Sequence, residues 1–142
     1  MVESDISYAL RILKEKNESI VIVKDNNILY ESKLDGLKAI IHLIDNKVNI
    51  EGSSVADKII GKAAALLLSY LKVKEVYAAV LSEKAIEVLK NNLIIFNYSE
   101  MTKNIINRTN TGMCPMEKAV MNINDGLTAY KVIKSIIFSK NN

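Results

Sequence analysis

The residues with the clearest chemical potential lie in the stretch NRTNTGMCPMEKA, residues 107–119. Cys114 precedes Pro115, and proline suits the first position of a helix, so the thiol is expected at a helix N-terminus. The positive end of the helix dipole stabilises a thiolate there. Arg108 would strengthen this effect, whereas Glu117 would oppose it. Cys114 is therefore a candidate nucleophile, and the alternative is a small buried residue in a tight connection.

The loop that precedes the cysteine offers groups that bind polar ligands. It supplies a guanidinium, an amide, a hydroxyl and free backbone N–H groups, and such a loop can hold an anion or a polar ring. The candidate ligand-binding residues of this loop are Arg108, Asn110, Thr111 and Gly112.

A second candidate pair, Asp57 and Lys58, lies in the stretch SSVADKIIGKAAALLLSYL, residues 53–71. This stretch is apolar on nearly every side after residue 58, which predicts one central helix buried all round. If its N-terminus lies beside that of the Cys114 helix, Asp57 could act as an acid or base and Lys58 could contact an anion. The alternative makes Asp57 a capping residue and Lys58 a solvated one. His42 lies off the apolar stripe of its predicted helix, so we expect it to be exposed.

The composition indicates one ordinary globular domain, residues 1–142, with a net charge of +3. Charges of both signs alternate, so we expect no nucleic-acid partner. No apolar run reaches the roughly 18 residues that a membrane span needs, and the first residues lack the pattern of a signal peptide. A single cysteine excludes an internal disulfide, which favours a cytoplasmic protein.

Hydrophobic periodicity predicts helices that alternate with strands. A helix over about residues 5–16 precedes a hairpin, 19–24 and 28–32, with a turn at 25–27. A helix over about 35–44, the central helix, a strand at 75–81, a helix after Ser82 and a strand at 93–96 follow. A short edge strand at 105–106, a helix from Cys114 to about residue 124, a helix at 127–138 and a frayed tail at 139–142 complete the chain. This order predicts a three-layer α/β/α sandwich with a mixed sheet.

Three segments, SVADKIIGKAAALLL, EVYAAVLSEKAIEVL and INRTNTGMCPMEKAV, resemble an uncharacterised domain-of-unknown-function family of the cytidine-deaminase-like superfamily. The resemblance covers roughly Ile20 to Val120. It implies a cytidine-deaminase-like fold, in which two helix N-termini frame a pocket at one edge of the sheet. Related folds commonly associate, so a homodimer is expected by analogy.

The sequence departs from the zinc deaminases at the motifs that bind the metal. Those enzymes need H-x-E or C-x-E at one helix and P-C-x-x-C at another. This chain has Ala56-Asp57-Lys58 and Cys114-Pro115-Met116-Glu117 instead, with one cysteine and one histidine in total. We therefore expect no catalytic zinc and no other cofactor.

Two functions remain open from the sequence. The first is a module that binds a nucleotide-like or other small polar ligand near Asp57, Lys58 and Cys114. The alternative is a metal-free enzyme with Cys114 as nucleophile, assisted by Asp57 or Lys58.

Overall fold

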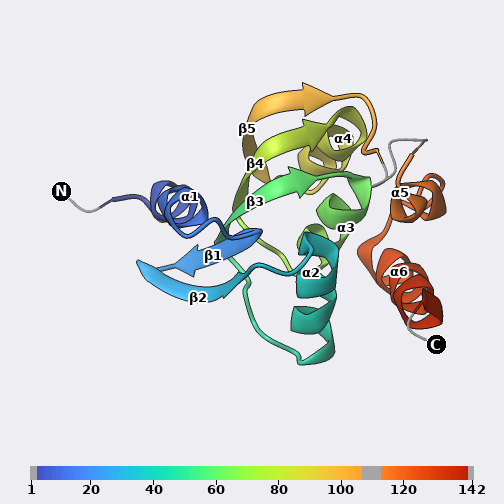
Figure 1. Ribbon diagram of the computed structural model, residues 1–142, viewed down its shortest axis with the longest axis horizontal. Coiled ribbons are helices and arrows are strands. Elements are labelled where there is room, and N and C mark those ends of the chain that lie inside the picture. Colours follow the sequence, from blue (N-terminus) through green and yellow to red (C-terminus); the bar gives the residue numbers. More distant parts are fainter. Residues whose placement is uncertain (1–2, 107–112, 141–142) are drawn as a thin grey trace.

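A computed structural model describes residues 3–106 and 113–140 of the chain. For residues 139 and 140 it describes only the backbone. Figure 1 shows a mixed sheet with helices on both sides of it. The elements in chain order are α1 (Asp5–Glu15), β1 (Ile20–Lys24), β2 (Asn27–Ser32), α2 (Gly36–Asp45), β3 (Ser54–Ile60), α3 (Lys62–Tyr70), β4 (Glu75–Ser82), α4 (Glu83–Asn91), β5 (Ile95–Thr102), α5 (Pro115–Ala119) and α6 (Gly126–Lys140).

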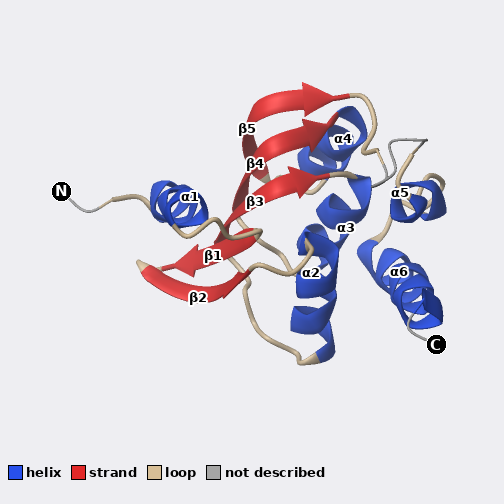
Figure 2. Ribbon diagram, in the orientation of Figure 1, coloured by secondary structure: helices blue, strands red, loops and turns tan. Residues whose placement is uncertain are grey.

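The five strands form one sheet in the order β2-β1-β3-β4-β5 (Figure 2). β1 runs antiparallel to both β2 and β3, whereas β3, β4 and β5 are parallel to one another. The predicted hairpin is confirmed, and the two strands predicted on either side of a helix, now β4 and β5 with α4 between them, are parallel neighbours. Parallel neighbours bring the carboxyl ends of β3 and β4 to the same edge of the sheet, where α2 and α3 begin.

Helices cover the sheet unequally on its two faces. Of the described helices, only α1 packs on one face, where Ala9, Ile12 and Leu13 contact Val21, Val23 and Ala56. α2, α3 and α4 pack on the opposite face around a core that includes Ile20, Ile22 and Val55, and α6 packs on the outer side of α3 (Figure 2). The mixed-sheet α/β sandwich predicted from the sequence is therefore confirmed.

The predicted central helix over residues 53–71 is wrong in its first half. Ser54–Ile60 form the middle strand β3, Gly61 turns the chain, and only Lys62–Tyr70 are helical. Val55 and Ala56 are both fully buried because α1 covers one side of β3 and the main core covers the other. A strand buried on both faces carries a continuous apolar run, and hydrophobic periodicity cannot distinguish it from a buried helix.

The strand predicted at 93–96 is longer and lies later, at Ile95–Thr102. β5 is an edge strand with mostly exposed side chains, so its polar second half carries no apolar signal. The turn-like stretch at residues 124–126 begins α6 and does not end the preceding helix, because Asp125 Oδ1 accepts the Thr128 N–H at 2.9 Å. α5 itself stops at Ala119.

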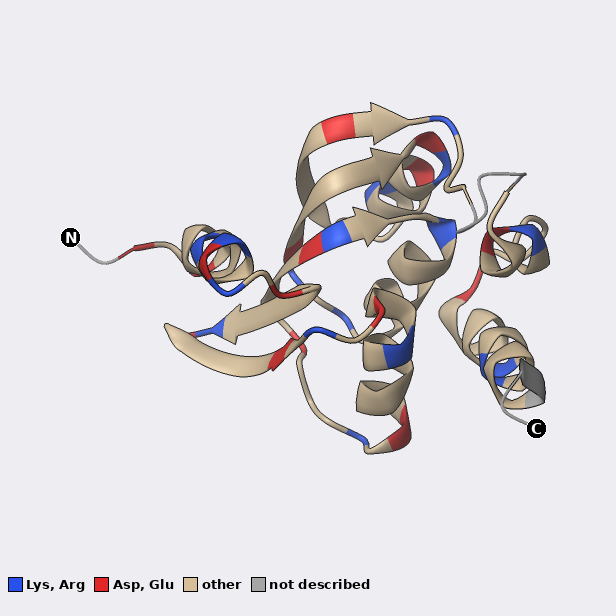
Figure 3. Ribbon diagram, viewed as in Figure 1, with Lys and Arg blue, Asp and Glu red and all other residues tan. Residues whose placement is uncertain are grey.

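Charged residues of both signs are interspersed over the helices and strands (Figure 3). No helix in the described part of the chain is both long and apolar enough to cross a membrane. His42 is exposed, as predicted.

Candidate functional site

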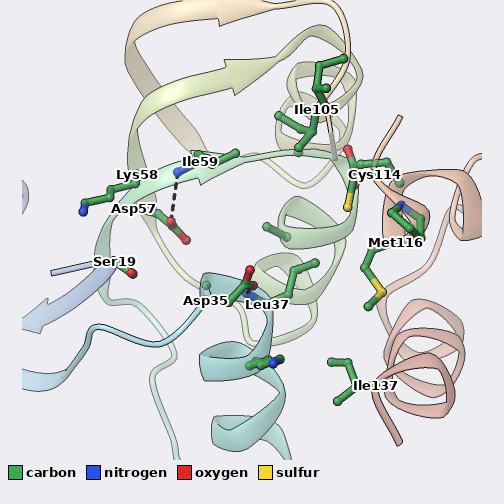
Figure 4. Close-up of a pocket in the computed structure, with 17 residues that line it drawn as sticks. Ser19, Asp35, Leu37, Asp57, Lys58, Ile59, Ile105, Cys114, Met116 and Ile137 are labelled. Atoms are coloured by element: carbon green, nitrogen blue, oxygen red, sulfur yellow. Dashed lines mark hydrogen bonds between the residues drawn. The ribbon is translucent and has the colours of Figure 1, made fainter. Parts of the chain in front are cut away.

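A pocket of about 670 Å³ opens at the carboxyl end of β3, where the first turns of α2 and α3 meet α5 (Figure 4). Its walls come from five elements and from the segment after β5, so residues far apart in the sequence share one space. The residues that line it include Asp35, Gly36 and Leu37 at the start of α2, Asp57, Lys58 and Ile59 of β3, Gly61, Ile105, and Cys114, Met116 and Glu117 around α5.

Asp57 is the most unusual of these side chains. It is only 2% exposed, and its Oδ1 accepts the Ile59 N–H at 3.2 Å, as the dashed line in Figure 4 marks. Its Oδ2 has no hydrogen-bond partner among the described residues. Gly36 packs so closely that a Cβ there would lie 3.0 Å from Oδ2. A buried carboxyl oxygen without a partner is rare, because desolvation makes it costly.

The environment of Asp57 raises the pKa of its carboxyl to about 7. Burial is the largest cause, because it disfavours the charged form, and the negative charge of Asp35 adds to it. The backbone N–H groups of Ile59 and Lys58 lower the pKa, but each has a smaller effect than burial. Asp57 therefore changes its protonation near neutral pH, which is the range in which acids and bases are useful in binding or catalysis.

The sequence suggested that Asp57 begins or caps a helix. Asp57 instead lies within the strand β3, so it caps no helix. Strand geometry also separates it from Lys58, since successive side chains point to opposite faces of a sheet. Lys58 Nζ donates to Asn17 Oδ1 at 2.8 Å, just after α1. Lys58 contributes to the pocket wall, but its ammonium group is engaged away from Asp57.

At the starts of α2 and α3, which both line the pocket, first-turn N–H groups already have carboxylate partners. Asp35 is the N-cap of α2, and its Oδ1 accepts the Leu37 N–H at 3.0 Å. For α3, the two oxygens of Glu117 accept the N–H groups of Lys62 and Ala63, both at 2.8 Å. Glu117 comes from α5, so a residue more than fifty positions away caps this helix.

From the sequence, Glu117 was expected to oppose a thiolate at Cys114. Its hydrogen-bonded contact with the start of α3 was not predicted. Gly61 is the signal that could have pointed to it, since a Cβ at this position would lie 2.2 Å from Glu117 Oε1. Its backbone φ of −100° is open to any residue, so glycine is needed here for space and not for conformation. Gly61 thus lets α5 dock against the start of α3.

Cys114 is the N-cap residue of α5, as predicted, but its side chain makes no capping hydrogen bond. The thiol is half-buried and lines the same pocket as Asp57, which lies on the other side of the space in Figure 4. Nearby, Ile106 forms an isolated antiparallel bridge with Met113 in place of an edge strand. The predicted ligand residues Arg108, Asn110, Thr111 and Gly112 lie outside the described residues.

A metal site needs several donor side chains close together. Among the described residues, no three histidine, cysteine, aspartate or glutamate side chains gather closely enough to hold a metal ion. The described donors therefore do not fit a catalytic zinc, which takes three protein ligands.

The chain was compared with known proteins. A crystal structure of a DUF1893 family protein (TM1506) from Thermotoga maritima is similar over 95% of this chain and 92% of its own, with 32% identity and a TM-score of 0.85. A diaminohydroxyphosphoribosylaminopyrimidine deaminase/5-amino-6-(5-phosphoribosylamino)uracil reductase from the same organism covers 67% of this chain and 35% of its own, with 16% identity and a TM-score of 0.45. A search of curated proteins gave no significant match.

Residues 8–137 match the family described as TM1506, a domain of unknown function (DUF1893). This match spans nearly the whole described fold, from α1 to α6, and agrees with the similarity in structure. The chain belongs to the DUF1893 family.

Proposed function

We propose that this protein is a ligand-binding domain on a cytidine-deaminase-like scaffold, and that it holds a small polar molecule in the pocket around Asp57. The observation that carries the proposal is the Oδ2 of a buried carboxyl, which has no partner among the described residues, in a pocket of about 670 Å³. Pockets for small molecules usually measure roughly 300–1,000 Å³ and place a few polar groups among apolar walls. A ligand that donates a hydrogen bond to Oδ2 would remove the cost of burying that oxygen alone.

The proposed scaffold assignment is supported by the strand order, in which an antiparallel hairpin precedes three parallel strands, and by the two helices that begin at the pocket. The ligand-bearing space lies at the carboxyl ends of parallel strands, where open α/β sheets commonly bind ligands. We also propose a cytoplasmic setting, since the single cysteine serves no disulfide within the chain.

A fragment screen followed by amide NMR spectroscopy tests the proposed function. Fragments that bind in the pocket should shift the N–H signals of Leu37 and Ile59, which flank the two acids. Asp57→Asn should weaken those fragments, whereas Asp25→Asn should not, because Asp25 is exposed in the hairpin turn and does not line the pocket. The proposed function fails if no fragment of a polar library shifts the pocket signals.

The alternative function, a metal-free enzyme, is favoured by the thiol of Cys114 in the same pocket as Asp57. A thiolate there could add to the carbon of a C=O or C=N group, forming a C–S bond as the π bond breaks, while protonated Asp57 gives its proton to the oxygen or nitrogen that takes the electron pair. Rapid labelling of Cys114 by iodoacetamide at neutral pH, slowed in Asp57→Asn, would support this alternative. Labelling at the rate of an unactivated thiol in both proteins would remove its basis.

A further inference from the structure

We propose that the ligand is a small organic cation, such as an amidinium or ammonium group on an apolar body, and that it lacks a phosphate. Its N–H groups would donate to Asp57 Oδ2. This inference rests on the proposed function and specifies the chemistry of its ligand.

The polar group of the pocket that lacks a partner is an acceptor, so it favours a ligand that donates a hydrogen bond. Asp57 Oδ2 is an acceptor without a partner among the described residues, and it is buried at the edge of the pocket. Gly36 closes one side of this carboxyl, and Asp57 itself lines the pocket. The N–H groups of an amidinium match a carboxylate closely, because the charge strengthens each hydrogen bond.

The charges around Asp57 favour a cation over an anion. Asp35 at the start of α2 faces the same space, as Figure 4 shows, and its negative charge acts on Asp57. Glu117 from α5 is bonded to the start of α3. Of the lysines that line the pocket, Lys58 is bonded to Asn17, and Lys38 is exposed in the first turn of α2. Ser19 and Cys114 add a hydroxyl and a thiol to the lining.

At the starts of α2 and α3, carboxylates of the protein occupy the positions where a phosphate would bind. Helix N-termini bind anions through first-turn N–H groups. At α2 the Leu37 N–H donates to Asp35, and at α3 the Lys62 and Ala63 N–H groups donate to Glu117. A phosphate would have to displace a carboxylate of the protein itself. The pocket therefore disfavours a ligand that carries a phosphate group. A nucleobase without a phosphate could still bind there.

The remaining wall suits an apolar body. Leu37, Ile59, Ile105, Met116 and Ile137 line the pocket from five different parts of the chain (Figure 4). A flat or compact hydrocarbon group could pack against them while its charged end reaches Asp57.

Benzamidine, benzoate and inorganic phosphate are suitable probes, because benzamidine and benzoate have the same ring and opposite charges. Binding to the full chain would be measured by amide NMR titration at about pH 6 and about pH 8. Benzamidine should shift the Leu37 and Ile59 signals and bind about tenfold more tightly at the higher pH, since the Asp57 carboxyl with a pKa of about 7 is mostly ionised only there. Benzoate and phosphate should leave these signals unchanged.

Two variants separate the roles of the acids. Asp57→Asn should weaken benzamidine at least tenfold at the higher pH and abolish the pH dependence. Asp35→Asn should weaken it severalfold while asparagine still caps α2. Asp25→Asn should match the natural protein, and melting curves would verify that each variant is folded.

The inference is overturned if benzamidine does not bind, if it shifts signals elsewhere, or if Asp57→Asn leaves its affinity unchanged. Binding of benzoate or phosphate in the pocket would also overturn it, but would support the proposed function. If fragments other than cations bind there, the proposed function stands and the inference fails. If no fragment binds at all, both fail.

Discussion

The replacement Asp57→Asn should stabilise the folded protein above neutral pH, although it changes a buried residue at the candidate site. A carboxyl whose pKa is higher in the folded than in the unfolded protein favours folding while it is protonated. The unfolded chain releases this proton near pH 3.8 and the folded chain near pH 7, so the folded state binds more protons between these values. Stability therefore falls as the pH rises through this interval, and the loss is complete above the folded pKa.

The magnitude follows from the difference between the two pKa values. A shift of about three units at roughly 1.4 kcal/mol each gives a cost of about 4 kcal/mol at full ionisation. About 2.5 kcal/mol of this cost develops between pH 5 and pH 8. Asparagine keeps the shape of the side chain and cannot ionise, but its buried amide leaves a polar group unsatisfied at a cost of roughly 1–3 kcal/mol. The net gain at pH 8 should then be about 1–3 kcal/mol.

Urea unfolding of both proteins at several values from pH 5 to pH 8 measures this effect. The free energy of unfolding of the natural protein should fall relative to that of Asp57→Asn by about 2.5 kcal/mol across the range. Asp35→Asn should move the fall to lower pH, because the charge of Asp35 contributes to the raised pKa of Asp57. Parallel pH profiles for the natural protein and Asp57→Asn would refute the reasoning.

Three further predictions concern the docking of α5 and the cysteine. Glu117→Ala should destabilise the protein by about 3 kcal/mol in urea unfolding, because it leaves two buried N–H groups of α3 unpaired. As a control, Lys118→Ala at the exposed neighbouring position should change stability by less than about 0.5 kcal/mol. Gly61→Ala should cost about 2 kcal/mol through its clash with Glu117, and less in the Glu117→Ala background; equal costs in the two backgrounds would exclude the clash as the cause. Cys114→Ala should retain fragment binding within about threefold in NMR titrations, because the thiol makes no capping hydrogen bond, and loss of binding would favour the nucleophile alternative.

The elements that the sequence predicted well are those whose polar and apolar positions alternate clearly. α1, α2 and α4 each carry one apolar stripe and begin after a capping side chain, at Ser4, Asp35 and Ser82. The hairpin was predictable because a β-branched run at residues 20–23 and a second apolar segment at residues 28–30 flank a turn triplet. These signals are local, and neighbouring layers do not change them.

The candidate site was harder to predict, because its key features depend on tertiary contacts. β3 lies between two apolar layers, so its sequence lacks the alternation of polar and apolar residues that identifies a strand. For this reason Asp57 was predicted at the start of a helix and not inside a strand. The sequence still identified Asp57 and Cys114 as members of one pocket, although by the wrong local structure. No local pattern links Glu117 to α3, since the contact joins residues more than fifty positions apart.

The crystal structure of the protein with its strongest-binding fragment tests the central claim most directly. We predict that the fragment lies between Asp57 and Cys114, with a donor within about 3 Å of Asp57 Oδ2. A fragment bound elsewhere, or one in the pocket that leaves Oδ2 without a partner, would contradict the account.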